Sequence, residues 1–353
     1  MGTLLINTTS LWNCGDDFIR KGLLDLMQLR SYTKTLWWNR GYGITDSFAN
    51  DLDINLQAAD YILIAGTPEW IDKTERLYLH SLRHGTPLSL VGVGLKGCIR
   101  NASQRKLLER IANSGLVEVC MARDRIALDF LHSLGFKEVE LILDPAFFMN
   151  PLPKKDANNI LCWRDISRNN PKLLRHFMAW IRWTLKGRVA CEQWAHMYNR
   201  LMQDIFSAMP DPKLVVVHDN REIKTAEQLF GKEHIFYSID YLEMLKVYST
   251  ATQYVGTRIH GAIAAAIHGA PIHLIYPNKK AIVIEDSVKL LNRYFHDINK
   301  SIKVDYLTDK QMDLDTINER PSLNNAFYNA LQQEREKVRS KLKRATKLGT
   351  YME

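Results

Sequence analysis

Cysteine is scarce in this chain, and its spacing forms no pattern. The 353 residues include five cysteines, and no two of them are separated by only two residues. That spacing is common in zinc sites and redox pairs, and an odd number of scattered cysteines also argues against a disulfide framework. We therefore expect no metal site, and a reducing compartment such as the cytoplasm.

Long apolar runs and a secretory leader are also lacking. No run approaches the roughly 18–20 apolar residues that cross a bilayer. Met1–Asn7 has neither the basic start nor the long apolar stretch of a secretory signal. Those residues are typical of a first strand instead, so we expect a cytoplasmic protein without a membrane-spanning helix.

Acidic residues are outnumbered by basic ones. The chain has 47 lysines and arginines against 39 aspartates and glutamates, a formal net charge of +8, which favours anionic partners. No nucleic-acid motif accompanies the charge, so we expect no nucleic-acid partner. Seven of the basic residues fall in Glu334–Glu353. This stretch is either a solvated helical tail or a segment that docks on an anionic membrane surface.

Short apolar runs alternate with amphipathic segments along the chain. Tyr61–Ala65 and Leu88–Val93 are nearly all apolar, which predicts strands buried on both faces. Helical patterns follow them at Thr74–His84 and Ser103–Asn113. This alternation is typical of a parallel, doubly wound (Rossmann-like) α/β sheet. The two prolines and the charges of Asn150–Asp156 predict a linker. We therefore expect α/β domains at residues 1–150 and 151–298, and a helical segment with the basic tail at 299–353.

The most informative stretch is Val255–Lys280. It predicts a strand, a turn that carries Arg258 and His260, a small-residue helix and a second strand. Free backbone N–H groups and the positive end of the helix dipole make such a turn an anion site. Arg258 can grip a carboxylate or phosphate with two parallel hydrogen bonds, and His260 can carry a proton near neutral pH. The alternative is a surface ion pair for Arg258 and a satisfied core histidine at His260.

Three groups of residues, in this order and spacing, resemble the motifs of the polysaccharide pyruvyl transferase family. The early group is Asn13-Cys14-Gly15-Asp16, and the middle group combines Ala122-Arg123-Asp124 with Asp144-Pro145-Ala146-Phe147. The late group comprises Gly256, Arg258, His260, Gly261, Gly269, Pro271, Tyr276 and Lys279. The resemblance reaches from about residue 13 to about residue 280.

The resemblance implies an enzyme that moves the enolpyruvyl group of phosphoenolpyruvate onto two hydroxyls of one sugar. The product would be a pyruvate ketal in a surface polysaccharide or exopolysaccharide. It also implies a GT-B-like fold, with residues 1–150 on the acceptor side of a cleft and residues 151–298 on the phosphoenolpyruvate side. Phosphoenolpyruvate is a substrate, so no cofactor is expected. The acceptor would be lipid-linked or nucleotide-linked, and the basic tail would suit peripheral contact at the inner face of the plasma membrane.

The donor side would be cationic. In the implied reaction His260 would be the proton donor or the partner of the leaving group, Arg258 and Arg164 would clamp the anion, and Lys279 would add charge. Arg164 lies at the end of a candidate strand, Ile160–Trp163, and its plainer interpretation is an ion pair with a neighbour.

The acceptor side would be carboxylates and an amide. Asp16 is the first candidate for the general base, although an aspartate there can instead cap a helix. Asn13 shares its turn, and Glu69 is either a sugar-site carboxylate or a charge at the start of a helix. Asp144 and Arg123 are expected to be supporting residues.

Two other functions fit the same residues. One is a GT-B glycosyltransferase that uses a nucleotide sugar, and the other is a non-catalytic sugar-binding module that has kept the fold. A nucleotide sugar would stabilise the first against heat, and the second would release no phosphate.

Overall fold

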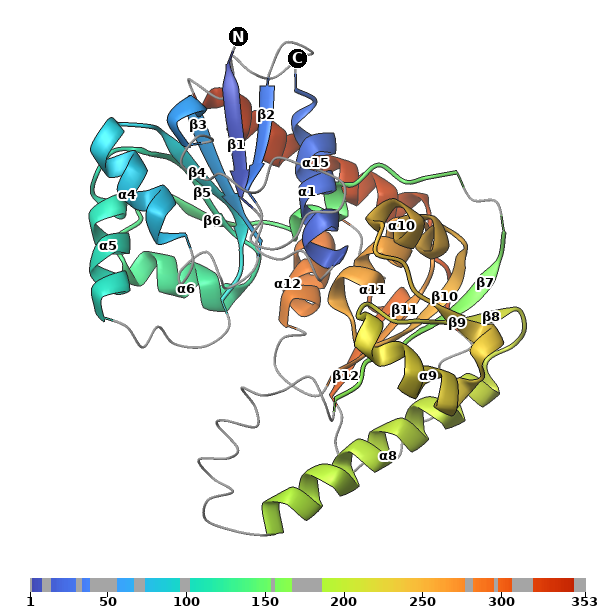
Figure 1. Ribbon diagram of the computed structural model, residues 1–353. Coiled ribbons are helices and arrows are strands. Elements are labelled where there is room, and N and C mark those ends of the chain that lie inside the picture. Colours follow the sequence, from blue (N-terminus) through green and yellow to red (C-terminus); the bar gives the residue numbers. More distant parts are fainter. Residues whose placement is uncertain are drawn as a thin grey trace.

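The computed structural model describes residues 2–7, 14–29, 34–38, 56–66, 74–95, 102–153, 156–166, 186–276, 282–294, 298–306 and 320–345. Within them the chain forms two six-stranded sheets with helices between the strands (Figure 1). Every strand pairing in both sheets is parallel. The α/β class with two parallel sheets, predicted from the alternating sequence pattern, is confirmed.

The N-terminal sheet has the strand order β2-β1-β3-β4-β5-β6. The chain adds β2 on one side of β1 and the later strands on the other, so the order of the strands reverses between β1 and β3. Its strands are β1 (Thr3–Asn7), β2 (Lys34–Trp38), β3 (Tyr61–Ala65), β4 (Leu88–Val93), β5 (Val117–Ala122) and β6 (Val139–Leu141). The helices of this half are α1 (Cys14–Met27), α4 (Glu75–His84), α5 (Ala102–Ala112), α6 (Arg125–Ser133) and the short 3-10 helix η1 (Pro145–Phe148).

The C-terminal sheet has the order β12-β11-β10-β7-β8-β9, and its direction reverses between β10 and β7. Its strands are β7 (Asn158–Cys162), β8 (Lys213–Val216), β9 (Ile235–Phe236), β10 (Ala251–Gly256), β11 (Ile272–Tyr276) and β12 (Ile302–Tyr306). The helices are α8 (Lys186–Ala208), η2 (Asn220–Glu222), α9 (Ile223–Phe230), η3 (Lys232–His234), α10 (Tyr241–Ser249), α11 (Ile259–Ala266), α12 (Ile282–Leu291), α13 (Ile298–Ser301) and α15 (Asn325–Arg344). In sheets of this kind, ligands bind beyond the carboxyl ends of the strands where the order reverses.

Strand β12 corrects one expectation. Everything after residue 298 was expected to be helical, but Ile302–Tyr306 pairs in parallel with β11. Its sequence, I-K-V-D-Y, alternates apolar and polar residues with the period of a strand. The helix expected in this segment is α15. The proposed boundaries between domains stay a prediction.

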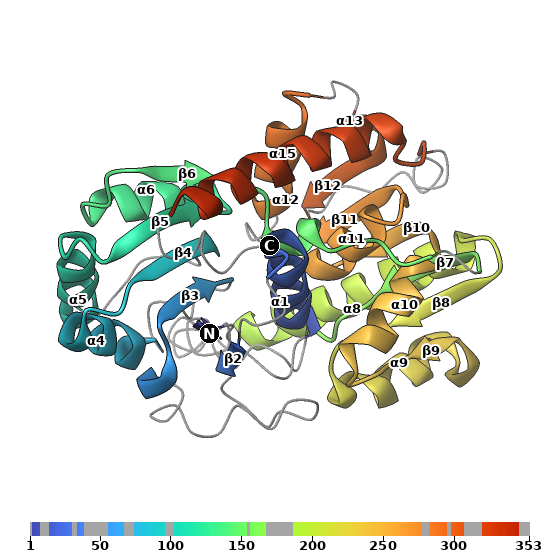
Figure 2. The same ribbon diagram turned by 90° about the horizontal axis from the view of Figure 1, so that it is seen from above.

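Helix α1 lies between the two sheets, as two perpendicular views show (Figures 1 and 2). The inner faces of both sheets belong to one continuous cluster of buried apolar residues, which also includes Phe18 and Leu23 of α1. The ring of Phe18 packs edge-on against Tyr248 of α10, with centroids 6.1 Å apart, and the guanidinium of Arg20 lies 5.2 Å from the ring centroid of Tyr241. The outer faces are covered separately, by α4, α5 and α6 on one side and by α8 and α9 on the other. The two halves therefore share a core.

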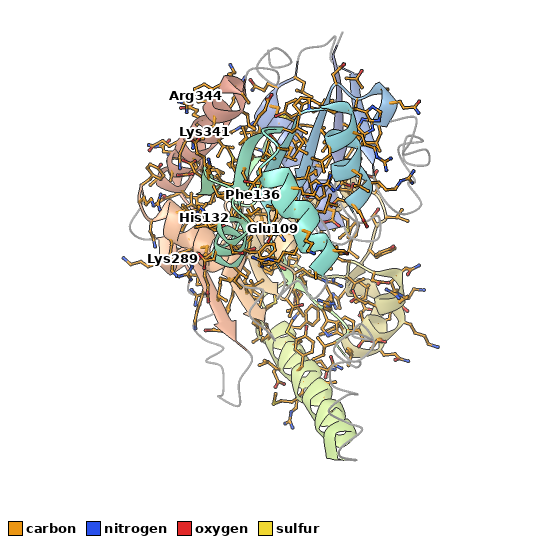
Figure 3. The ribbon with its side chains drawn as sticks, turned by 90° about the vertical axis from the view of Figure 1, so that its left-hand side faces the viewer. Glu109, His132, Phe136, Lys289, Lys341 and Arg344 are labelled. Carbon is orange, nitrogen blue, oxygen red and sulfur yellow. The ribbon has the colours of Figure 1, made fainter. Side chains whose placement is uncertain are left out.

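Helix α15 crosses both halves (Figure 2). Near its start, the Leu323 backbone N–H donates to the carbonyl of Gly269 at 2.9 Å. Further along, Arg335 donates to the Asn150 side chain at 2.8 Å, and Lys341 pairs with Glu140. Part of the basic charge thus contacts groups within the protein, while Lys341 and Arg344 both lie on the side seen in Figure 3. Among the helices in the described part of the chain, none combines the length and apolar character that a bilayer crossing needs.

Candidate functional site

The site is built where the C-terminal sheet changes direction, at the carboxyl ends of β7 and β10. Arg164 follows β7 by two residues, and Arg258 precedes α11 directly. At such a point the connections that follow two neighbouring strands lead to opposite faces of the sheet and leave a crevice beyond the strand ends for a ligand. The motif turn predicted around Arg258 and His260 is therefore at the position where such sheets bind ligands.

Arg258 is held by a carboxylate that the sequence analysis missed. Its Nη2 donates to both Oε atoms of Glu222, at 2.6 and 2.8 Å. Glu222 ends η2, just after β8, and its side chain is 1% exposed against 17% for Arg258. Burial opposes the charged form of Arg258, but the Glu222 carboxylate outweighs it and raises the Arg258 pKa. Arg258 is thus a fixed cation.

A second nitrogen of the same guanidinium is available to a ligand. The Nε of Arg258 is buried and makes no hydrogen bond to any residue in the described part of the chain. A buried donor without an acceptor is costly, by about 1–3 kcal/mol. An anion seated beside Arg258 would supply the acceptor. Arg258 therefore forms an ion pair, although a buried one and not the surface pair of the alternative interpretation, and its Nε has no acceptor within the described residues.

His260 lies at the junction of the two halves. Its Nε2 is 3.4 Å from Oδ2 of Asp144, which belongs to the N-terminal half. The ring also packs on Gly15 in α1, where a methyl group would lie only 2.1 Å from Nδ1. The side chain is 12% exposed, and its Nε2 makes no hydrogen bond of good geometry within the described residues. His260 is therefore not the satisfied core histidine of the plainer interpretation.

Asp144 was expected to be a supporting residue, and it is fully buried. Its Oδ1 accepts from the Ala146 N–H at 2.9 Å, and its Oδ2 accepts from Nη1 of Arg123 at 2.6 Å. Burial by itself would raise the Asp144 pKa, but Arg123 and His260 outweigh it and lower that pKa well below its usual range. Asp144 is thus an ionised carboxylate that faces His260.

A buried polar cluster centres on His218, after β8. Its Nδ1 is 3.2 Å from Sγ of Cys14, and its Nε2 is 2.6 Å from the hydroxyl of Tyr248. Burial, followed by the electrostatic influence of Arg258, His260 and Arg164, lowers the His218 pKa well below 6.5. His218 is therefore neutral, and three of the four predicted donor-side residues gather around it. Polar residues directly after a buried strand were the signal for this cluster in the sequence.

Of the remaining candidate site residues, the structure describes only Asp16. Asp16 is buried in the first turn of α1, which begins at Cys14. It is therefore not the residue that precedes and caps the helix, although an acidic side chain in a first turn still suits the helix dipole. Asn13, Glu69 and Lys279 lie outside the described residues. No group of side chains suited to holding a metal ion occurs in the described ranges.

The arrangement suits a small anion that undergoes proton transfer. Two arginines supply positive charge, and the histidine beside them contacts residues of both halves. Ionic hydrogen bonds are strongest where water is excluded. The site therefore has the elements that stabilise developing charge on a bound carboxylate or phosphate.

The fold of this chain is similar to the folds of several solved structures. S. aureus MnaA, in a co-structure with UDP, is 12% identical over 100% of this chain and 99% of that chain, with a TM-score of 0.55. UDP-GlcNAc 2-epimerase from Methanocaldococcus jannaschii, in complex with UDP-GlcNAc and UDP, is 12% identical over 95% and 98%, with a TM-score of 0.48. The calicheamicin glycosyltransferase CalG4 is 12% identical over 99% and 98%, with a TM-score of 0.44. The likeness to MnaA concerns the fold alone, and the GT-B-like prediction is confirmed.

Comparisons of the sequence point to one family. No curated protein sequence matches the chain. The family model for polysaccharide pyruvyl transferase matches residues 13–279, which include all three predicted motifs. This chain therefore belongs to the polysaccharide pyruvyl transferase family.

Proposed function

We propose that this protein transfers the enolpyruvyl group of phosphoenolpyruvate to two hydroxyls of a sugar, forming a pyruvate ketal in a surface polysaccharide. The observation that carries the proposal is the buried Nε of Arg258, which has no acceptor among the described residues and lies in a cationic site with His260. A carboxylate or phosphate of the donor would be that acceptor. Membership of the family supports the reaction class.

The proposed chemistry starts with a proton. His260 gives a proton to the methylene carbon of phosphoenolpyruvate, whose double-bond electrons form the new C–H bond and leave an oxocarbenium-like centre on the adjacent carbon. A sugar hydroxyl oxygen bonds to that carbon and loses its proton to a base. The bond to phosphate then breaks, and the second hydroxyl closes the ring with loss of its proton. Phosphoenolpyruvate and the diol thus give the ketal and inorganic phosphate, and no oxidant or reductant is needed.

Each candidate residue has a role in this scheme. Arg258 and Arg164 would neutralise the donor, and Lys279 would add charge. Asp16 is the candidate base, because it shares the first turn of α1 with Cys14, whose Sγ contacts His218. Asn13 and Glu69 would contact the acceptor sugar.

A nucleotide-sugar glycosyltransferase is the second candidate. It is favoured by the GT-B-like fold and by the UDP named for the S. aureus MnaA structure. A sugar-binding module without catalysis is the third. For the glycosyltransferase, phosphoenolpyruvate would not stabilise the protein against heat. For the binding module, no phosphate would be released from phosphoenolpyruvate.

Thermal unfolding with phosphoenolpyruvate, and with a panel of nucleotide sugars, tests these functions. Binding to the native state raises the free energy of unfolding by mass action, by about 2.7 kcal/mol at a hundredfold excess over Kd, and so raises the unfolding midpoint. We expect phosphoenolpyruvate to protect the wild type. In Arg258→Ala the shift, taken from that variant's own midpoint, should require about 10–100 times more ligand, since ionic hydrogen bonds contribute about 1.5–3 kcal/mol.

The matched control is Arg105→Ala. Arg105 also pairs with a glutamate, Glu109, but it lies on α5, on the outer face of the N-terminal sheet. Its shift should equal that of the wild type. Equal protection of Arg258→Ala would remove Arg258 from the donor site. Protection by a nucleotide sugar alone would favour the glycosyltransferase.

The acceptor and the location belong to the same proposal. The acceptor would be a lipid-linked or nucleotide-linked sugar, and the protein would work in the cytoplasm, in peripheral contact with the inner membrane face. The net charge of +8 supports attraction to anionic lipid. Sedimentation with vesicles containing phosphatidylglycerol, against vesicles of phosphatidylcholine alone, tests this contact.

A further inference from the structure

We propose that Asp144 is a positioning residue for His260, so that the two form an Asp–His dyad contributed by opposite halves of the chain. Asp144 precedes η1 in the N-terminal half, and His260 lies in the first turn of α11 in the C-terminal half. Their facing atoms, Oδ2 and Nε2, are 3.4 Å apart. The role of this dyad in catalysis rests on the proposed function, whereas its geometry does not.

The Asp144 carboxylate is held in place by groups other than His260. The Ala146 N–H holds Oδ1, and Nη1 of Arg123 holds Oδ2. Arg123 is itself confined by Gly94, where a methyl group would lie 2.4 Å from its Nε. The remaining direction from Oδ2 is toward the imidazole. Asp144 therefore presents a charged acceptor in one orientation.

The imidazole is fixed from two sides. Gly15 of α1 packs closely on the side chain, near Nδ1, Cγ and Cβ, and Asp144 faces Nε2. The distance of 3.4 Å, without good hydrogen-bond geometry, is typical of a catalytic pair before its substrate binds, since such contacts tighten in the complex. Both contacts come from the N-terminal half. The histidine therefore has its working orientation only when the halves are joined.

This orientation assigns the two nitrogens. A carboxylate at Nε2 favours the neutral tautomer with its proton on Nε2, as an aspartate does in other Asp–His pairs. Nδ1 is then the nitrogen that exchanges a proton with a ligand. In the proposed reaction the Nδ1 proton goes to the methylene carbon of the donor. The Nε2 proton stays beside Asp144 throughout the transfer.

The tautomer of His260 tests the dyad without any ligand. Imidazole nitrogen shifts can be measured by long-range proton–nitrogen NMR on the full chain labelled at histidine, with His260→Gln to assign the signal. At alkaline pH we expect the proton on Nε2. A proton on Nδ1 in the wild type would overturn the proposal, whether or not any Asp144 variant folds.

Asp144→Asn gives the second readout. The neutral amide has one oxygen for two donors, the Ala146 N–H at Oδ1 and Nη1 of Arg123 at Oδ2, so the charged acceptor that faces Nε2 is lost in either orientation. The preference for a proton on Nε2 should therefore weaken, and the tautomer population should shift toward a proton on Nδ1. A population equal to that of the wild type would overturn the proposal. Donor turnover should fall by about 10²–10⁴, the loss typical of a disturbed acid–base group, while protection by phosphoenolpyruvate stays within about threefold of the wild type.

Asp286→Asn is the matched control. Asp286 is also fully buried between the halves, pairs with an arginine (Arg125, 2.7 Å) and accepts a backbone N–H at 2.9 Å, but no contact joins it to His260. Asp286→Asn should leave the His260 tautomer unchanged. A shift of the proton toward Nδ1 in Asp286→Asn as well would overturn a specific role for Asp144. Failure of the wild type to bind phosphoenolpyruvate would count against the proposed function alone.

Discussion

Replacing Gly15 with alanine tests whether His260 is seated on α1. The added methyl group would lie 2.1 Å from Nδ1, 2.7 Å from Cγ and 3.0 Å from Cβ of His260. Ordinary contact begins at 3.4 Å, so the ring must move by at least 3.4 − 2.1 = 1.3 Å at Nδ1. Overpacking of this kind costs about 1–3 kcal/mol. The better helix propensity of alanine offsets at most about 1 kcal/mol of that cost.

The consequence for function should exceed that for stability. A misplacement of about 1 Å can cost about a hundredfold in rate. We would measure urea unfolding and donor turnover for Gly15→Ala, His260→Ala and the double variant. Removing the imidazole relieves the clash, so the double variant should be more stable than the sum of the single changes predicts. Additive effects within about 0.5 kcal/mol, or normal turnover in Gly15→Ala, would refute this account of the contact.

Two further predictions concern the residues around Arg258. Glu222→Gln removes the buried partner of Arg258 and should lower the free energy of unfolding by about 3 kcal/mol, since one charge stays buried without its counterion; a urea titration that shows less than about 0.5 kcal/mol would contradict this. Burial and the nearby cations keep the His218 pKa below 6.5, so the unfolded state takes up the proton first. The contribution of His218 is therefore present above about pH 6.5 and is lost as the pH falls, by about 1.4 kcal/mol per pH unit. Unfolding from pH 7 to pH 5 should show a shallower loss in His218→Leu, and an identical loss would contradict the neutral state of His218.

The sequence predicted a strand well wherever the pattern of apolar residues within one segment was sufficient to identify it. Tyr61–Ala65 and Leu88–Val93 were predicted with the bounds that the structure shows, because continuous apolar runs between turns leave little ambiguity. Ile302–Tyr306 was missed although its alternation has the period of a strand, because the whole segment after residue 298 was assigned to helix. Strand order in either sheet was not predictable, since alternation fixes the class of sheet but not its winding.

The site was predictable in part for a similar reason. A local turn brought Arg258 and His260 together in the sequence, and the structure places them in one region. Their partners are remote in the sequence: Glu222 follows another strand, and Asp144 and Gly15 belong to the other half. Such pairings depend on how the sheets face each other, which no single motif encodes.

The position of α1 has a consequence for synthesis of the chain. One face of α1 packs on the N-terminal sheet, while Phe18 packs on Tyr248 of α10, which the ribosome makes much later. Domains fold as they emerge, N-terminal first, and exposed apolar surface at that stage promotes aggregation. The nascent N-terminal half therefore carries an uncovered apolar stripe until α10 and α11 have been made. A fragment that ends in the linker would keep that stripe permanently and should require a chaperone, or the missing half supplied as a second chain, to remain in solution.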